Sequence, residues 1–247
     1  MGFKDHFSSK ASEYAKARPT YPASLFAALA AGTQGHTLAW DCGTGNGQAA
    51  YGLAAHFERV QATDPSQAQI SEARPHSRIT YKVGAESDSG LESHSADLVV
   101  AAQAAHWFDL DAFYAESRRV LLPGGVVAIW CYGLCKVDAD IDRVMLRFYR
   151  DTVGPYWPPE RRLVDTEYRT LPFPFAEQPF PVSAMELDWR LEDFEAYLQT
   201  WSAVTRYTKE TGHDPVSPLV AMLAPLWGEV ARTVSWPLAG RLGRIEA

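Results

Sequence analysis

Asp41-Cys42-Gly43-Thr44-Gly45-Asn46-Gly47 follows a short apolar run, Thr37-Leu38-Ala39-Trp40, and precedes a stretch of small apolar residues. Glycines in a turn between a strand and a helix let the backbone approach a ligand where a Cβ would collide. The third glycine of a dinucleotide-binding loop would fall at Gln48, so this loop departs from the pattern that holds a pyrophosphate. An acidic residue at the entrance of the loop favours a ligand that carries an amine.

Four further strand-like runs follow the loop, and segments with helical spacing separate them. They lie at residues 59–63, 79–83, 96–102 and 126–130. Short strands that alternate with helices indicate right-handed βαβ units and a parallel sheet covered on both faces. The sequence therefore predicts an α/β fold.

The pattern changes beyond Gly133. Three segments place apolar residues at helical spacing and are interpreted as packing helices of a cap: 138–150, 192–201 and 219–231. Residues 154–181 are rich in proline and aromatic residues, which indicates packed irregular structure because disordered linkers are poor in aromatics. The strand-like run at 233–236 is followed by Pro237, which favours a sheet edge or a bulge.

These patterns divide the chain into three parts. We expect a closing segment and cofactor-binding core at 1–133, a cap with one strand at 134–231, and a C-terminal strand that completes the core sheet at 232–247.

Composition excludes several classes of function. The net charge is −7, the pI is near 5.5, and the 23 Lys and Arg form no long run, so a nucleic-acid partner is not expected. There is no apolar signal-peptide core, and no apolar run reaches the roughly 20 residues of a membrane span. The cysteines Cys42, Cys131 and Cys135 lack zinc-site spacing, which favours free thiols in a reducing compartment. We expect a cytoplasmic protein without a metal or a membrane partner.

Asp64 ends the predicted strand at 59–63, about 20 residues beyond the glycine loop. A carboxylate at this place can bind both hydroxyls of a ribose. The alternative is a tight turn and a surface Asp that bind nothing. The combination of the loop and the Asp, in this strand order, favours a nucleoside cofactor.

The chain resembles the class I S-adenosylmethionine-dependent methyltransferases. Residues 41–47 look like the first motif of that family, 64–66 resemble its ribose-binding turn, 84–87 are similar to the segment beside the adenine, and 121–125 match the turn before the fifth strand. The resemblance implies a Rossmann-like, seven-stranded, mostly parallel sheet with helices on both faces and a helical, aromatic cap inserted after strand 5. It also implies S-adenosyl-L-methionine as the cofactor.

A narrower likeness is to the small-molecule branch that includes trans-aconitate methyltransferase. It rests on residues 14–22, 105–109 and 156–159. In such relatives an N-terminal Tyr and Arg, here Tyr14 and Arg18, close over the cofactor. One departure is Gln69, where many relatives carry a hydrophobic residue beside the adenine.

The resemblance thus implies a set of cofactor-binding residues. They are Tyr14, Arg18, Asp41, Gly43, Gly45, Gly47, Asp64, Pro65, Ser66, Gln69, Ala85, Glu86, Ser87 and Gln103.

Methyl transfer needs a base only if the acceptor must lose a proton, as a phenol, alcohol or carbon acid does and a carboxylate does not. His106 follows the fourth strand at the edge that faces the ligand crevice of an open α/β sheet. One hypothesis is that His106 orients or deprotonates the acceptor. The alternative is a histidine that hydrogen-bonds the backbone and shapes the pocket.

Several residues are candidates for the acceptor site. Trp107, Tyr132 and Trp157 either form its walls or pack in the core. An acidic acceptor, with a carboxylic acid as one candidate, would be held by Arg161, Arg162 or Arg206. Exposed arginines of a cap are the alternative for these three.

The sequence thus favours a small-molecule methyltransferase. A nicotinamide-dependent oxidoreductase and a non-catalytic S-adenosylmethionine-binding protein are the alternatives. The acceptor and the oligomeric state stay open.

Overall fold

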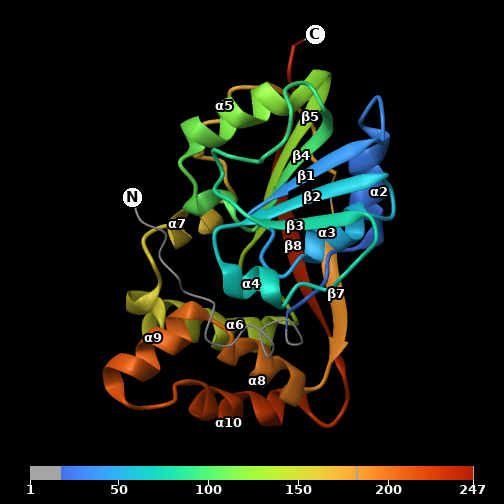
Figure 1. Cartoon of the computed structure of the whole chain (residues 1–247). Coiled ribbons are helices and arrows are strands. Elements are labelled where there is room, and N and C mark those ends of the chain that lie inside the picture. The colour runs from blue at the N-terminus through green and yellow to red at the C-terminus, as the bar shows by residue number, and fades with distance from the viewer. Residues whose placement is uncertain (1–17, 182, 247) are drawn as a thin grey trace.

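The computed structural model describes residues 18–181 and 183–246, and its centre is one eight-stranded sheet (Figure 1). The strand order is β3-β2-β1-β4-β5-β8-β6, with β7 also paired to β8. The strands are β1 Leu38–Cys42, β2 Arg59–Asp64, β3 Ile79–Val83, β4 Ala96–Ala102, β5 Leu121–Tyr132, β6 Ala176–Gln178, β7 Ser183–Trp189 and β8 Arg232–Arg244. The first five are parallel, and β8 runs antiparallel to β5. The predicted Rossmann-like α/β fold is confirmed.

The sheet has eight strands where seven were expected, because β8 is long enough to pair with two strands along one edge. Its first residues pair with β7, from Trp189 opposite Arg232 to Ser183 opposite Leu238. Its last residues pair with the three-residue strand β6. Pro237 lies inside β8 rather than at its end, one residue before the pairing with β5 begins at Leu238.

Helices cover the sheet, and those between residues 134 and 231 belong to the region called the cap. They are α2 Ala23–Ala31, α3 Gln48–Leu53, α4 Gln67–Ser71, α5 Leu110–Val120, α6 Ala139–Arg147, α7 Arg161–Asp165, α8 Leu191–Gln199, α9 Ser202–Thr211 and α10 Val216–Trp227. Short 3-10 or π turns are η2 Ala105–Trp107, η3 Phe148–Thr152 and η4 Gly154–Tyr156. Figure 1 shows α6, α8, α9 and α10 gathered at one end of the sheet, away from α5.

The core lies on both faces of the sheet, as expected for parallel strands. Alternate strand residues point to opposite faces: Ala39 and Leu98 join the cluster that also contains the buried residues of α2, α8 and α10. Trp40 and Val99 join the cluster that contains those of α5. The cap helices therefore share one hydrophobic core with the sheet, which fixes the cap beside the carboxyl ends of the strands.

Within the described residues, no helix is both long enough and apolar enough to cross a membrane.

Candidate functional site

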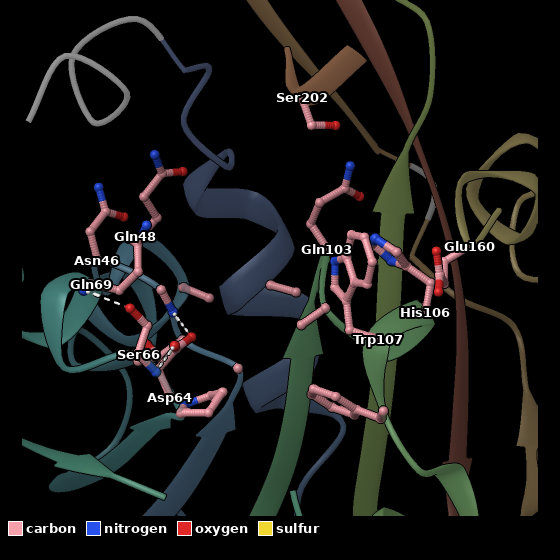
Figure 2. A pocket seen from close by; sticks show the side chains of 18 of the residues that line it. Asn46, Gln48, Asp64, Ser66, Gln69, Gln103, His106, Trp107, Glu160 and Ser202 are labelled. Carbon is pink, nitrogen blue, oxygen red and sulfur yellow. Dashed lines mark hydrogen bonds between the residues drawn. The ribbon is translucent and has the colours of Figure 1, made fainter. Parts of the chain in front are cut away.

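The loops at the carboxyl ends of the parallel strands line a cavity of about 610 Å³ (Figure 2). This volume is typical of a site that encloses small molecules. Figure 2 shows Asp64 and Ser66 on one side of the cavity and His106 and Trp107 on the other. The cap adds Trp157, among other residues, to the wall.

The glycine loop after β1 has the backbone conformation that its sequence predicts. Gly43, Gly45 and Gly47 all have positive φ angles, of 68°, 58° and 90°. A Cβ on Gly43 would lie 2.6 Å from the Cβ of Ala104, whereas a Cβ on Gly45 would meet only the Gln69 side chain, at 3.8 Å. Because Gly45 lines the cavity, that Cβ would occupy space next to a ligand.

Asp64 is held in place at the end of β2 by backbone amides. Its Oδ2 accepts a hydrogen bond from the Gly45 amide at 2.9 Å, and its Oδ1 accepts one from the Ser66 amide at 2.8 Å. Ser66 also caps α4 by accepting from the Gln69 amide at 3.3 Å. The carboxylate is thus oriented in the cavity wall, where it fits a pair of ribose hydroxyls.

Asp41 lies behind the glycine loop and does not line the cavity. It is fully buried; its Oδ2 accepts from the Thr44 hydroxyl at 2.6 Å, and its Oδ1 has no partner among the described residues. Burial raises the pKa of this carboxyl to about 7. Because Asp41 is fully buried and outside the cavity wall, its direct contact with a ligand stays a prediction, and in this structure the carboxyl holds the glycine loop through Thr44.

Gln103 joins the ends of two strands. Its side chain donates to the Tyr132 carbonyl at 3.0 Å and accepts from the Tyr132 amide at 2.9 Å, across the ends of β4 and β5. It also has a positive φ of 55°, which is uncommon for a residue other than glycine. This clamp brings Gln103 and Tyr132 into the cavity wall.

Arg18 connects the N-terminal part of the chain to the cap. It donates to the Tyr132 hydroxyl at 3.1 Å and to the Thr200 carbonyl at 3.4 Å. Its guanidinium lies 5.4 Å from the centre of the Tyr197 ring. Arg18 thereby spans the boundary between the sheet and the cap at the wall of the cavity.

His106 lies on the opposite side of the cavity from Asp64 (Figure 2), and Arg161 is near enough for its charge to act on the ring. His106 Nδ1 lies 2.7 Å from the Tyr168 hydroxyl. Burial lowers the pKa of His106, and the nearby positive charge of Arg161 lowers it further, to about 3, so the ring is neutral. Arg161 donates from Nε to the Tyr149 hydroxyl at 2.7 Å and stacks over the Trp157 ring, 4.6 Å from its centre.

Most of the residues named from the sequence meet in this cavity. Those that line it are Arg18, Gly43, Gly45, Asp64, Pro65, Ser66, Gln69, Ala85, Glu86, Ser87, Gln103, His106, Trp107, Tyr132, Trp157 and Arg161. Asp41, Gly47, Arg162 and Arg206 are not in the wall. Arg206 donates to the Tyr156 carbonyl at 3.5 Å instead. Tyr14 falls outside the described residues.

The sequence did not single out some wall residues of the cap. Four of them are Glu160, from the turn before α7, Tyr197, from α8, and Trp201 and Ser202, from the start of α9. Their helical spacing predicts only that Tyr197 and Trp201 lie on a packing face. The same spacing does not show which residues of a packing face also contact a ligand. Across the described part of the chain, no group of three or more His, Cys, Asp or Glu is arranged to hold a metal ion.

Comparison with known proteins agrees with this geometry. Residues 40–129 match the family model described as "Methyltransferase domain". The chain is 35% identical over 216 residues to a protein of Dictyostelium discoideum named as a methyltransferase, covering 86% of this chain and 82% of the relative. It is 24% identical over 243 residues to a Saccharomyces cerevisiae protein named as an S-adenosylmethionine-dependent methyltransferase, covering 83% of each.

A solved structure agrees over nearly the whole chain. It is described as a type II methyltransferase from Anaeromyxobacter dehalogenans, with 47% identity, a TM-score of 0.88, and coverage of 93% of this chain and 99% of that one. The chain belongs to the S-adenosylmethionine-dependent methyltransferases. The methyltransferase family and its donor S-adenosylmethionine overturn the alternative of a nicotinamide-dependent oxidoreductase.

Proposed function

We propose that this methyltransferase acts on a small molecule with a carboxylate, and that Arg161 binds this acceptor. The observation that carries the proposal is that Arg161 lines the cavity near His106, whose pKa its positive charge lowers. Its side chain is only 16% exposed. A positive charge enclosed in this way, beside aromatic rings, is a strong binding group for an anion.

The hydrogen bonds of Arg161 leave donors for a ligand. A guanidinium has five N–H groups. In the described structure only Nε has protein partners, namely the Tyr149 hydroxyl and, at 3.3 Å, Asp165 Oδ1. The N–H groups of the two Nη atoms are therefore left to form a bidentate contact with a carboxylate.

The enclosed site supports a small acceptor rather than a macromolecule. The cavity has to hold the donor as well as the acceptor, and Trp157 and Trp201 of the cap line it. The net charge of −7 also disfavours an extended anionic polymer.

The proposed chemistry needs alignment and no base. S-Adenosylmethionine supplies a methyl group on a positively charged sulfur; Asp64 and the glycine loop would hold it. In a transfer to a carboxylate, the acceptor oxygen would form the new C–O bond as the C–S bond breaks, the electron pair would stay on sulfur, and no proton would have to move. Residues that align the acceptor with the methyl carbon can contribute up to ~7–11 kcal/mol of the barrier reduction.

A substrate panel tests the proposal. The purified chain is incubated with S-adenosylmethionine and with aliphatic, unsaturated and aromatic carboxylic acids, each beside its amide and its alcohol, and S-adenosylhomocysteine is measured. We expect turnover of acids and not of the matched amides. Turnover of amides, alcohols or amines in place of acids would contradict the proposal.

Two arginine variants sharpen this test. Arg161→Gln is expected to raise KM for the acid roughly 10- to 100-fold, because a charged hydrogen bond is lost, while the Kd of S-adenosylmethionine is unchanged. Arg162→Gln is the matched control, since Arg162 is exposed and outside the cavity wall. Equal KM values in the two variants would remove Arg161 from the acceptor site.

A further inference from the structure

Tyr168 is positioned against His106 by an unusual stretch of backbone. The two side chains come from distant parts of the sequence, η2 and the turn after α7, and meet at 2.7 Å. Tyr168 and the preceding Glu167 both have positive φ angles, of 58° and 56°. This conformation is unfavourable for residues other than glycine. The fold therefore accepts local backbone strain where the Tyr168 ring is placed against His106.

The hydrogen-bond pattern determines where the protons lie. Tyr168 is fully buried, so its O–H needs an acceptor inside the protein. The acceptor that the structure provides is Nδ1 of His106. The Tyr168 hydroxyl therefore donates to Nδ1 of His106.

Both groups keep their neutral forms. Burial raises the pKa of Tyr168 well above its ordinary value, so the hydroxyl retains its proton. The pKa of His106 is lowered by burial and by Arg161, so the ring carries one proton. In a neutral imidazole one nitrogen donates and the other accepts. If Nδ1 accepts from Tyr168, Nε2 must carry the proton.

We infer that Tyr168 is a positioning residue that locks His106 in its Nε2–H tautomer, so that His106 offers a hydrogen-bond donor to the methyl acceptor and does not act as a base. Nε2 has no partner among the described residues, and His106 lines the cavity. The inferred tautomer rests on the contact between Tyr168 and His106. The chemical class of the acceptor, a carboxylate, rests on the proposed function.

A general base at His106 would require the other tautomer. With the proton on Nδ1, the buried Tyr168 hydroxyl would lose its acceptor, which makes this state roughly 10- to 100-fold less populated. Glu160 lines the same side of the cavity as His106 (Figure 2), but burial and the charge of Arg161 keep the pKa of the ring lowered and so oppose its protonation. His106 and Arg161 thus present donors from the same side of the cavity, as suits an acceptor that already has a negative oxygen.

The tautomer can be measured without any substrate. Long-range ¹H–¹⁵N NMR of the histidine side chains distinguishes the two tautomers, and the His106 signals are those that vanish in His106→Gln. We expect Nε2 protonated and Nδ1 unprotonated from pH 6 to 8 in the wild type, and a mixture in Tyr168→Phe. A protonated Nδ1 in the wild type would overturn the inference, whatever the substrate panel shows.

Two replacements of His106 distinguish a donor from a base. The amide of Gln reaches the position of Nε2, and that of Asn the position of Nδ1. We expect kcat of His106→Gln to stay within about 10-fold of the wild type, with kcat independent of pH from 6 to 9, and His106→Asn to fall roughly 10- to 100-fold in kcat/KM. Equal loss in both variants, together with a base-like rise of wild-type kcat with pH, would overturn the inference.

The readouts also separate this inference from the proposed function. If no acid is methylated but the NMR shows the Nε2–H tautomer, the carboxylate proposal fails and the lock stands. If acids are methylated and Nδ1 is protonated, the lock fails alone. Thermal unfolding of Tyr168→Phe shows whether that variant folds, and the wild-type spectrum does not depend on it.

Discussion

The backbone amide of Gly45 donates a hydrogen bond of 2.9 Å to Oδ2 of Asp64. This bond joins the glycine loop after β1 to the end of β2, so the two cofactor-binding features that the sequence shows separately form one unit. Ser66 fixes the second carboxylate oxygen. The carboxylate is therefore oriented before a ligand arrives, which lowers the entropic cost of binding.

Asp64→Asn should weaken the binding of S-adenosylmethionine roughly 10- to 100-fold, because it removes the charge that would accept from the ribose hydroxyls while conserving size. Isothermal calorimetry gives the Kd directly. Glu92→Gln is the control, since Glu92 is an exposed carboxylate outside the cavity wall. An unchanged Kd in Asp64→Asn would show that another group binds the ribose.

Gly43 and Gly212 both have a positive φ, of 68° and 74°, but their surroundings differ, so Gly43→Ala and Gly212→Ala separate the two costs of an added Cβ. At Gly212 nothing lies within 4 Å of the added Cβ, so we expect only the backbone cost, about 1 kcal/mol. At Gly43 the contact with Ala104 adds roughly 1–3 kcal/mol of overpacking. Urea unfolding measures both, and equal losses would contradict the close approach at Gly43.

Glu116 should make the protein sensitive to acid. Burial alone would raise its pKa, but hydrogen bonds from Arg119 and Ser89 outweigh this and lower the pKa to about 2. The stabilisation is present above pH 4.5 and is lost as the pH falls towards 2, at up to about 1.4 kcal/mol per pH unit. Glu116→Gln should remove this slope in unfolding experiments; the same slope in the variant would assign it to other carboxylates.

Asp41 should change the stability of the protein with pH in the direction opposite to Glu116. Its folded-state pKa of about 7 lies above the ordinary 3.8, so the folded protein binds this proton more tightly than the unfolded chain does. Without ligand, the Asp41 contribution to stability therefore falls as the pH rises from about 4 to 7, and levels off above that. Asp41→Asn should abolish this fall, as measured by thermal unfolding between pH 5 and 8. A steeper fall in the variant would contradict the raised pKa.

The sheet and the cofactor side of the cavity could be predicted because their signals are local. The glycine loop, Asp64 and the short apolar strands each occupy a few consecutive residues, and parallel strands place their carboxyl ends together. The predicted strand at 79–83 agrees with β3, and that at 96–102 with β4. Strand β5 begins earlier than expected, at Leu121, because α5 ends at Val120 and the proline and glycines that follow lie inside the strand.

The acceptor side could not be assembled from the sequence, because its residues depend on how the cap folds. Arg161 and Arg206 look alike in the sequence, yet only Arg161 lines the cavity. Helix α9 was not predicted, because most of its residues are polar and it buries only Ala203 and Val204. The contact between Tyr168 and His106 depends on a left-handed turn at Glu167 and Tyr168. Because neither residue is a glycine, the sequence does not indicate this turn.

The pairing of β5 with β8 sets an order of events on the ribosome. Tyr132 is opposite Leu238, so the edge of β5 stays open until roughly a hundred more residues have been synthesised. An open edge of a buried, hydrophobic strand is a template for pairing with other chains. Nascent chains that stall within the cap should therefore need a chaperone, and a chain truncated before Arg232 should aggregate rather than accumulate as an isolated cofactor-binding core.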